Sequence, residues 1–469
     1  MKNTYIKLLS ISVLFLGVFT ISSCSKTAPG PGVAVPTVNT TNAIINVTST
    51  SAQSGGTVIN DGGGTITANG VCYSSSNVKP TITDSKTSEP VSTFGIAYPA
   101  YTSFLKGLAS NTTYYLRAYA TNSAGTGYGA IIKFTTASNL VSLNVTVSTL
   151  VGNGASGYLD GSGTGALFNN PEALTVDAFG NLFVSDSFNN YIREVTPGGV
   201  TSTIAGDGNI GFLNGAALSA EFYAPQGLAF DASSNLYVAD FGNNVIRKIT
   251  QGGVVSTYIG TGQAGYNDGT DPLYYYYNNP AGVAVDSKGN IFIADKGNNV
   301  IRKVTTAGVS STFAGTRTAG YVDSTGTYAS FNRPNAIAID ASDNLYIADL
   351  GNHAIRKITP AGKVTTLAGG PTIAQSSLLN LPAGIAVDKG GNIFIADETG
   401  RILELTSGNI IYVLAGTANV SGFNNGSGST ATFNLPQGIA VDGSGNIYVA
   451  DKNNNCIRKL VISDVQNAN

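Results

Sequence analysis

The sequence predicts an all-β protein whose main part is a closed ring of six four-stranded blades, preceded by a smaller β-sandwich. One stretch, Asn278 to Thr305, recurs six times along the chain. A fixed period of about 50 residues is typical of closed arrays in which every repeat forms one four-stranded sheet. The copies are located by one aspartate, found at Asp186, Asp240, Asp295, Asp349, Asp397 and Asp451.

Each repeat divides into four short strands joined by tight turns. In the third copy two turns lie at Asp286 to Asn290 and Asp295 to Asn299, where Asp and Gly favour a reversal of the chain. The first strand alternates small with branched apolar residues, which indicates burial on both faces near a crowded axis. The expected strands are Gly282–Asp286, Ile291–Ala294, Val300–Thr305 and Val309–Ala314.

The third strands carry the signature of a known family. The segment GNHAIRKI, at Gly351 to Ile358, and its sisters NNYIREV, NNVIRKI, NNVIRKV and NNCIRKL resemble the NHL repeat, over a range from Leu140 to about Ile462. The fifth copy departs from it, because ETGRILEL places Leu403 where the others have arginine. The resemblance implies an NHL-type six-bladed β-propeller over residues 141–469. Members of this family mostly bind partners, and some are enzymes.

The ring is expected to close through the N-terminal end of the repeats. The sixth copy ends with its third strand, Asn455 to Leu460, and no fourth strand follows. The missing strand stands before the first copy, where Val147 to Gly152 matches Val255 to Gly260. Because closure removes open sheet edges, we expect Val147 to Gly152 to complete the last blade.

Residues 1–24 have the pattern of a bacterial lipoprotein signal peptide. A basic start precedes an apolar stretch, and the end, Ile21 to Cys24, resembles a lipobox in which Cys24 is acylated. An ordinary secretory signal with an incidental cysteine is the alternative. Residues 25–42, rich in Ser, Pro and Gly, are expected to form a flexible tether. We expect the protein in the cell envelope, at the outer membrane on its periplasmic or surface face, held there through the lipid anchor only.

Residues 43–137 are predicted to form a separate β-sandwich. The stretch FLKGLASNTTYYLRAYATNSAGTGYGAIIKFTT resembles the fibronectin type III modules of exported Bacteroidetes proteins. Tyr114, following Leu108, fits the tyrosine corner of such domains, in which the phenol pins a loop to a strand. We expect a spacer that lifts the ring off the membrane, with peptide or glycan binding as the alternative.

Composition argues against several classes of function. Charged residues make up 11% of the chain and the net charge is −2, which gives no basic patch for nucleic acid. His353 is the only histidine and occupies the turn position of the repeat, so a site built on several histidines is excluded and a Ser-His-Asp triad is disfavoured. Cys72 and Cys456 are expected to be small buried hydrophobes rather than metal ligands or nucleophiles.

The long loops between blades carry a second repeated signature, as in GYLDGSGTGALF at 157–168. Repetition favours a structural role, in which the aromatic residue fills the space between blades and the Asp or Asn caps a turn. The alternative is an aromatic, amide-rich face that binds carbohydrate or peptide. The extra tyrosines Tyr274 to Tyr276 are not repeated, so Tyr274 and Tyr276 are candidate ligand contacts. Tyr277 aligns with the buried aromatic position.

The residue after each loop proline should begin the innermost strand and face the axial channel. These positions are Glu172, Gln226, Ala281, Asn335, Ala383 and Gln437. Because they differ between blades, Glu172, Gln226, Asn335 and Gln437 are the preferred ligand-binding residues. A hydrated channel mouth is the alternative. No cofactor is predicted, although such oxygens could hold a divalent cation.

The repeated Asp and Arg residues are expected to be structural. Two aspartates per copy, exemplified by Asp286 and Asp295, should form turns rather than act as acids or bases. The arginine of the third strand, such as Arg302, should pair with one of them and contribute little if exposed.

These observations favour a membrane-anchored, exported binding protein whose propeller loop face holds a glycan, a peptide or a protein partner, without nucleic acid. One alternative is a metal-assisted lactonase- or lyase-type enzyme with Glu172 and Asn335 at the channel mouth. The other is a structural module of a surface assembly. Binding is favoured over catalysis, and no catalytic residue is assigned.

Overall fold

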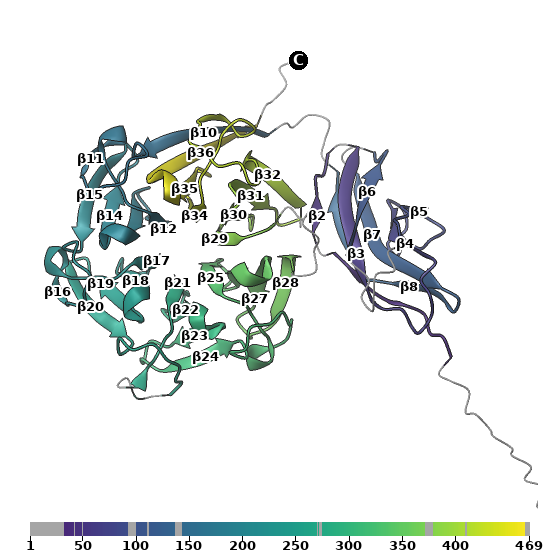
Figure 1. Ribbon diagram of the computed structural model, residues 1–469, viewed down its shortest axis with the longest axis horizontal. Coiled ribbons are helices and arrows are strands. Elements are labelled where there is room, and N and C mark those ends of the chain that lie inside the picture. The colour runs from purple at the N-terminus through teal and green to yellow at the C-terminus, as the bar shows by residue number, and fades with distance from the viewer. Residues whose placement is uncertain are drawn as a thin grey trace, which may run out of the picture.

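The computed structural model describes residues 32–41, 43–48, 50–91, 100–109, 112–136, 143–269, 271, 274–370, 379–408 and 410–464. The predicted signal peptide with Cys24, and residues 25–31 and 42 of the predicted tether, lie outside these residues. The described chain is all-β, with short 3₁₀ turns and no α-helix among its described elements. Six four-stranded antiparallel sheets surround a central axis, and a smaller β-sandwich stands beside the ring (Figure 1). We number these sheets as blades one to six in chain order.

Blades one to three are consecutive in the chain and run from the axis outward. Blade one comprises β12 (Pro171–Val176), β13 (Leu182–Asp186), β14 (Tyr191–Val195) and β15 (Val200–Ala205). Blade two comprises β17 (Pro225–Phe230), β18 (Leu236–Asp240), β19 (Val245–Ile249) and β20 (Val254–Ile259). Blade three comprises β21 (Pro280–Val285), β22 (Ile291–Asp295), β23 (Val300–Val304) and β24 (Ser310–Ala314). All four strands expected for the third copy are present.

The last three blades include the closure of the ring. Blade four comprises β25 (Pro334–Ile339), β26 (Leu345–Asp349), β27 (Ala354–Ile358) and β28 (Val364–Gly369). Blade five comprises β29 (Pro382–Val387), β30 (Ile393–Asp397), β31 (Arg401–Leu405) and β32 (Ile410–Gly416). Blade six comprises β34 (Pro436–Val441), β35 (Ile447–Asp451), β36 (Cys456–Asp464) and β10 (Leu143–Val151).

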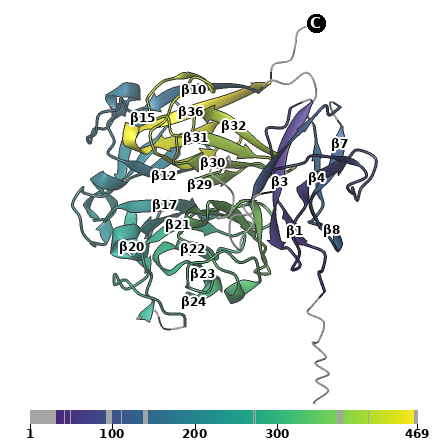
Figure 2. The same ribbon diagram turned by 45° about the vertical axis from the view of Figure 1, so that its right-hand side comes forward.

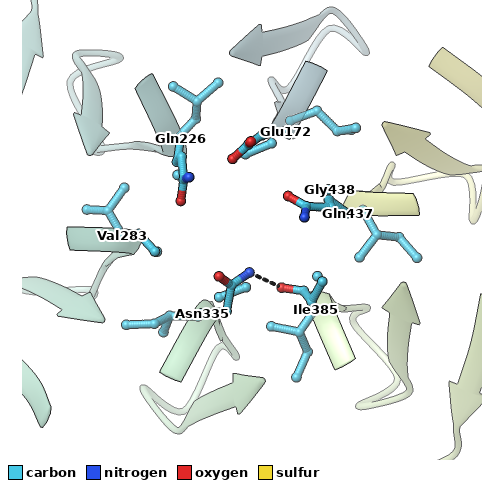
Figure 3. A pocket seen from close by; sticks show the side chains of 18 residues that line it. Glu172, Gln226, Val283, Asn335, Ile385, Gln437 and Gly438 are labelled. Carbon is cyan, nitrogen blue, oxygen red and sulfur yellow. Dashed lines mark hydrogen bonds between the residues drawn. The ribbon is translucent and has the colours of Figure 1, made fainter. Parts of the chain in front are cut away.

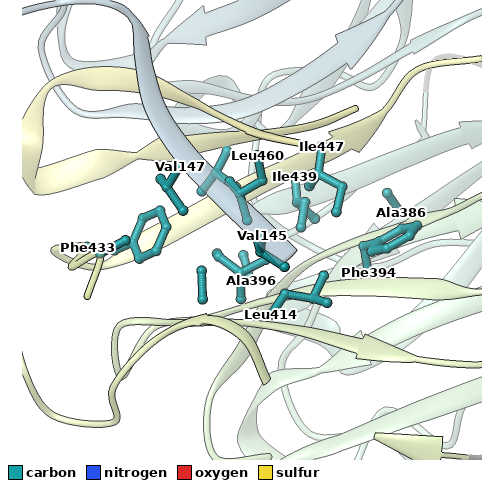
Figure 4. Close-up of a cluster of buried hydrophobic side chains, with 14 residues drawn as sticks. Val145, Val147, Ala386, Phe394, Ala396, Leu414, Phe433, Ile439, Ile447 and Leu460 are labelled. Atoms are coloured by element: carbon teal, nitrogen blue, oxygen red, sulfur yellow. The ribbon is translucent and has the colours of Figure 1, made fainter. Parts of the chain in front are cut away.

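The predicted closure is confirmed, because β10 pairs antiparallel with β36 along its length. Val145 and Val147 of β10 pack with Leu460 and with Leu414 of blade five in one buried cluster (Figure 4). The strand that precedes the repeats thus contributes to the packing between the last two blades. Its burial joins the two ends of the repeat region, so that the first and last blades are held in one ring.

Short elements occupy the turns and the loops between blades. A 3₁₀ turn follows the second strand of five blades, at η2 (Ser187–Asn189), η4 (Phe241–Asn243), η6 (Lys296–Asn298), η8 (Leu350–Asn352) and η9 (Lys452–Asn454). Three others, η1 (Gly163–Gly165), η3 (Ala217–Ser219) and η7 (Gly326–Tyr328), lie in inter-blade loops. The loop strands β11 (Gly161–Ser162), β16 (Gly215–Ala216) and β33 (Gly426–Ser427) pair with the outer edges of blades one, two and six.

The N-terminal unit is a sandwich of two sheets. One sheet contains β1 (Thr37–Thr40), β2 (Ile44–Ile45), β3 (Ser51–Asn60) and β6 (Tyr101–Lys106). The other contains β4 (Ala68–Ser74), β5 (Ser85–Lys86), β7 (Thr113–Asn122), β8 (Gly125–Tyr128) and β9 (Ile132–Thr135). Because β1 lies within the range 25–42, part of the predicted tether is a strand of the sandwich. The predicted tyrosine corner is present, since the Ala109 N–H donates to the Tyr114 hydroxyl at 3.0 Å.

One strand of the sandwich is shared with the ring. β2 pairs antiparallel with β3 and parallel with β32, the outer strand of blade five, so the two units form one continuous sheet (Figure 1). Figure 2 shows β3 of the sandwich beside the ring. Ile44 is fully buried in the sandwich core, whereas its neighbours Ala43 and Ile45 pack against the core of the ring. Successive side chains of a strand point to opposite faces, so this short strand contributes to both cores. The sandwich is therefore fixed to the ring rather than hanging from it.

A buried ion pair lies behind the second turn of five blades. Asp295 and Arg302 of blade three are both fully buried, and their oxygen and nitrogen atoms are 3.1 Å apart. Asp295 also accepts hydrogen bonds from the Asn278 N–H and the Asn298 amide. Burial raises the pKa of Asp295 to about 6, which leaves it ionised at neutral pH. The equivalent pairs are Asp186–Arg193, Asp240–Arg247, Asp349–Arg356 and Asp451–Arg458.

The arginine of each pair also holds the loop that connects two blades. Arg302 forms a second ion pair with Asp268 at 2.8 Å, and its guanidinium carbon lies 4.9 Å from the ring centres of both Tyr266 and Tyr277. The loop signature thus supplies two aromatic faces and one polar acceptor to a buried cation. The aromatic residues are structural, as predicted, but the Asp or Asn binds the buried arginine rather than capping a turn. The expectation that these arginines contribute little if exposed does not apply, because all five are buried.

Blade five lacks this arrangement. Leu403 replaces the arginine and is fully buried, and Asp397 pairs instead with Arg401 at 2.6 Å. The loop that leads into blade five is short and without the aromatic signature. Arginine and loop signature are therefore lost together, as expected if each depends on the other. On the outer edge of this blade, β2 of the sandwich takes the place that loop strands occupy in blades one, two and six.

The aspartates that end the first strands are turn formers, as predicted. Asp286 accepts hydrogen bonds from the N–H groups of Lys288 and Asn290 at 3.0 and 2.7 Å, and from the Asn290 side chain at 2.8 Å. Such Asx turns reverse the chain without burying charge. They lie at the far end of the innermost strand from the residue that follows the proline.

We predict that Arg302→Leu, which reproduces the residue of blade five, lowers the free energy of unfolding by about 3–5 kcal/mol, because it leaves Asp295 buried without its cation. The adjacent Lys303→Met is the matched control and should cost at most about 1 kcal/mol, since it removes partly exposed cation–π contacts to Phe292 and Phe313 and no buried ion pair. Urea unfolding followed by circular dichroism measures both. Equal costs for the two variants would contradict the structural role of the pair.

We also predict that the sandwich and the ring unfold together. Ile44→Ala should lower the free energy of unfolding by about 2–5 kcal/mol through loss of core packing, without separating the two units into two transitions. Ile59→Ala, at a site that is 65% exposed on the same sandwich, should change it by less than about 0.5 kcal/mol. Far-ultraviolet circular dichroism and tyrosine fluorescence report on both units. A separate early transition of the sandwich would contradict the shared-strand interpretation.

Candidate functional site

The channel mouth is built by the first residues of the six innermost strands. Glu172, Gln226, Ala281, Asn335, Ala383 and Gln437 all line one pocket on the axis, as predicted. The side chains of Glu172, Gln226, Asn335 and Gln437 point toward one another across it (Figure 3). The structure therefore brings together four of the six predicted ligand contacts, and each of these four comes from a different blade.

A second set of side chains surrounds this ring, and sequence reasoning did not assign it. These residues directly follow the buried aspartate of each blade: Ser187, Phe241, Lys296, Leu350, Glu398 and Lys452. Three of them contact the next blade's mouth residue. Lys452 pairs with Glu172 at 2.8 Å, Lys296 donates to Asn335 at 2.7 Å, and Glu398 accepts from Gln437 at 3.0 Å. Their variation between otherwise repeated turns was the signal that could have found them.

Gln226 is the mouth residue that remains available. Within the described part of the chain it forms no hydrogen bond, and its amide points into the pocket (Figure 3). By contrast, Asn335 also donates to the Ala383 carbonyl at 2.7 Å. The Glu172–Lys452 pair uses one carboxylate oxygen of Glu172. The other carboxylate oxygen of Glu172 can accept a hydrogen bond, and the Gln226 amide can both donate and accept. Together they can hold a ligand group that both donates and accepts hydrogen bonds.

The pocket is shallow. Its volume is about 70 Å³, well below the ~300–1,000 Å³ of cavities that enclose small-molecule ligands. Six aliphatic side chains line the channel beneath it: Leu174, Leu228, Val283, Ile337, Ile385 and Ile439. On their other side lies an apolar space of about 320 Å³, lined in part by Phe230 and Ile339. A ligand can therefore insert only a small polar group at the mouth, and the rest of it must lie across the loop face.

The electrostatics of the mouth combine both signs of charge. Burial lowers the pKa of the Lys296 ammonium, and the charge of Arg333 lowers it further, whereas Glu172 and Glu398 raise it. Burial raises the pKa of the Glu398 carboxyl, against the lowering effect of Lys296 and Lys452. The mouth can thus bind a group that carries both donors and acceptors.

This arrangement does not fit the divalent cation considered from the sequence. The Glu172 and Asn335 oxygens that would serve as ligands each receive a lysine ammonium. Two ammonium groups at these oxygens would repel a cation. Across the described residues, no cluster of three or more His, Cys, Asp or Glu side chains could hold a metal ion.

Aromatic side chains lie on one side of the mouth. Phe188 is 59% exposed, and the Lys452 nitrogen lies 6.0 Å from its ring centre. Phe241, on the next blade, lies 5.8 Å from the Lys296 nitrogen. The two rings and the two lysines form an amphipathic rim that runs from blade six through blades one and two to blade three. Such a rim gives a ligand both an apolar surface and hydrogen-bond donors.

The predicted tyrosine contacts lie apart from the mouth. Neither Tyr274 nor Tyr276 lines the axial pocket, although Tyr274 is 54% exposed on its loop. The sequence grouped Tyr275 with them, but Tyr275 is buried, and its hydroxyl donates to the Gly269 and Gly308 carbonyls. Tyr277 is buried, as expected, against Arg302. A ligand at the mouth and a ligand at Tyr274 would therefore occupy different sites.

The histidine and the two described cysteines have structural positions. His353 adopts the left-handed conformation at the end of η8, as Asn299 does in blade three, and its Nδ1 contacts the Asn380 carbonyl. This is the predicted turn role. Cys72 and Cys456 are both buried free thiols, the first in the sandwich and the second in blade six. Neither lines the mouth.

Comparison with known families decides the nature of the repeats. Residues 277–303, 331–358 and 433–460 match the NHL repeat. The chain contains NHL repeats. A curated relative, Protein SUPPRESSOR OF QUENCHING 1, chloroplastic, from Arabidopsis thaliana, is 30% identical over 321 residues. The match covers 62% of this chain and only 30% of that protein.

Solved structures resemble both units of the NHL-repeat chain together. A protein described as an auxiliary nutrient binding protein from Bacteroides thetaiotaomicron superposes with a TM-score of 0.52 at 14% identity, covering 92% of this chain and 98% of its own. A protein of unknown function from the same species superposes with a TM-score of 0.51 at 18% identity, again over 92% of this chain and 98% of its own. At such identities the similarity establishes a common fold, consistent with an NHL β-propeller.

No helix in the part of the chain that the structure describes has the length and apolar character needed to cross a membrane.

We predict that divalent cations do not stabilise the full chain, because lysines already contact the candidate oxygens at the mouth. A site filled at 100 times its dissociation constant would add about 2.7 kcal/mol to the free energy of unfolding. Thermal unfolding in chelator and then in calcium, magnesium, manganese or zinc measures this. A clear rise in melting temperature that Glu172→Ala abolishes would contradict the prediction and would favour the enzyme alternative.

Proposed function

We propose that this protein is an exported, lipid-anchored binding protein whose propeller mouth and surrounding loop face hold a glycan, a peptide or a protein partner. The observation that carries the proposal is that the side chains at the mouth are not repeated from blade to blade. Elsewhere the repeats use the same residue types for the same structural contacts in blade after blade. At the mouth, both sets of side chains differ between blades, although the backbone around them is repeated.

The geometry supports binding over catalysis in the mouth. The pocket admits only a small polar group, and the four converging side chains are two glutamines, an asparagine and a glutamate. Among the described residues, no nucleophile paired with a histidine base lines it. The free Gln226 amide, the second Glu172 oxygen and the two lysines can recognise hydroxyl or amide groups. The exposed Phe188 offers an apolar surface beside them.

Localisation and domain identity form part of the same proposal. We infer from the lipobox-like Ile21 to Cys24 that the protein is anchored in the cell envelope, at the outer membrane, through acylated Cys24. The repeats would form a six-bladed NHL propeller, and residues up to about 137 a fibronectin type III-like sandwich. The neighbour described as a nutrient binding protein makes uptake or capture of a nutrient one use of such a scaffold.

The proposal is tested by probing glycan and peptide arrays with the full chain and with Gln226→Ala. We expect a defined set of ligands for the native chain and an affinity five- to tenfold lower in the variant, the effect of about 1 kcal/mol from a lost hydrogen bond. Gln251→Ala, in an exposed turn away from the mouth, is the matched control and should bind as the native chain does.

Two outcomes would contradict the proposal. Ligands that bind equally well to the native chain and to the Gln226→Ala variant would place the site elsewhere, with the exposed Tyr274 as the next residue to test. Absence of binding to either array would favour a structural module of a surface assembly.

A further inference from the structure

A second pocket lies on the opposite face of the ring from the mouth. Each innermost strand begins at the mouth and ends at an Asx turn, so the turns after Asp177, Asp388 and Asp442 share this opposite face. The pocket between them has a volume of about 670 Å³, within the ~300–1,000 Å³ typical of ligand sites. Residues of blades one, five and six line it.

One wall of this pocket is an aromatic residue that the fold does not require. Phe179 sits at the tip of the first turn and is 86% exposed. Its N–H donates to Asp177 at 2.8 Å, the same backbone contact that Ser233, Ser342 and Ser444 make in their own turns. The turn therefore forms equally well with serine. The exposed ring of Phe179 is therefore not needed by the turn and is accessible to a ligand in the pocket.

The other walls are polar and carry both signs of charge. The carboxylates of Asp177 and Asp442 accept the hydrogen bonds of their own turns, whereas Lys389 and Lys459 are the two cations of the pocket. Lys389 lies in the blade five turn, where the equivalent residues of the other blades are Ala178, Ala232, Ser287, Ala341 and Gly443. Lys459 lines the blade six side, with its nitrogen 5.6 Å from the Tyr448 ring centre. Neither lysine has an ion-pair partner among the described residues. The Tyr448 hydroxyl, by contrast, donates to Asp442 at 3.0 Å and supports the wall.

We propose that this pocket binds an acidic saccharide, with a pyranose ring against the face of Phe179 and its carboxylate between Lys389 and Lys459. An exposed aromatic ring suits the apolar face of a sugar, and two free ammonium groups suit a carboxylate. Ser444 and Asn446 supply hydrogen-bonding groups for hydroxyls. The proposal goes beyond the binding assigned to the mouth and does not depend on it, because the two pockets share no lining residue.

The test is titration calorimetry of the full chain with tri-galacturonate, at low and then at high salt. We expect Phe179→Ser and Lys389→Ala each to weaken binding at least tenfold, and maltotriose, which is neutral, to bind at least tenfold more weakly than tri-galacturonate. Raising the salt should weaken binding of tri-galacturonate, since part of the attraction is between charges. The Phe179→Ser turn is expected to fold, because three sister turns contain serine at that position.

Gln226→Ala separates the two sites. It should leave the affinity for tri-galacturonate unchanged, whatever the arrays show for the mouth. The proposal is overturned if tri-galacturonate does not bind, if Phe179→Ser binds it as the native chain does, or if only Gln226→Ala weakens it.

Discussion

The buried ion pair between strands two and three is the interaction on which the ring depends. Arg302 contacts Asp295 inside its blade, and Asp268, Tyr266 and Tyr277 on the loop that connects its blade to the previous one. A buried charge is costly unless its partners are complete, so this arrangement specifies the loop conformation as well as the strand register. The same set of contacts in five blades fixes the spacing between neighbouring blades. The mouth residues lie on strands that these contacts position, but their own side chains form none of these contacts.

Blade five shows what happens when this constraint is relaxed. This blade lacks the arginine, and the sequence of the loop before it lacks the signature. Among the described residues, the strand that pairs with its outer edge is β2 of the sandwich. The sandwich uses that edge, because β2 pairs with β32 and places Ile44 and Ile45 in two different cores. Loss of one repeated interaction is thus coupled to the attachment of a whole domain. Because β2 pairs with both β3 and β32, the sandwich has a fixed position beside the ring. The orientation of the mouth relative to the sandwich is therefore fixed as well.

The sequence predicted the fold well, because period, turn chemistry and alternation all act locally. The six repeats, the closure by Val147 to Gly152 and the tyrosine corner at Tyr114 follow from patterns within short segments. The start of the sandwich and the role of β2 were not predicted, because Thr37 to Ile45 has no turn signal that separates it from a tether, and its partners lie far along the chain. Burial of Arg302 could not be read from its own strand, since the aromatic rings around it come from another segment.

Only part of the mouth was predicted, because local patterns reveal some of its residues and not the contacts between blades. Glu172, Gln226, Asn335 and Gln437 follow prolines in register, so their convergence could be inferred from one repeat. Lys296, Glu398 and Lys452 were missed because each contacts a residue of the following blade, and only the three-dimensional arrangement pairs them. Tyr274 and Tyr276 were predicted as ligand contacts because they are not repeated in the other inter-blade loops. The structure places them on a separate loop.

The central claim is that the repeated polar residues maintain the ring and that specificity comes from the non-repeated mouth. The most direct measurement compares the native full chain with a variant in which Glu172, Gln226, Asn335 and Gln437 are alanine and the partners Lys452, Lys296 and Glu398 are leucine, so that no charged side chain is left without its partner. Leu350 and Ala383 show that leucine and alanine at these two positions are compatible with the fold. Thermal unfolding and binding of an array-selected ligand are measured on both. We expect melting temperatures within a few degrees and at least a hundredfold loss of affinity, about 2.8 kcal/mol. A variant that binds normally, or one that unfolds before binding can be measured, would contradict this division of roles.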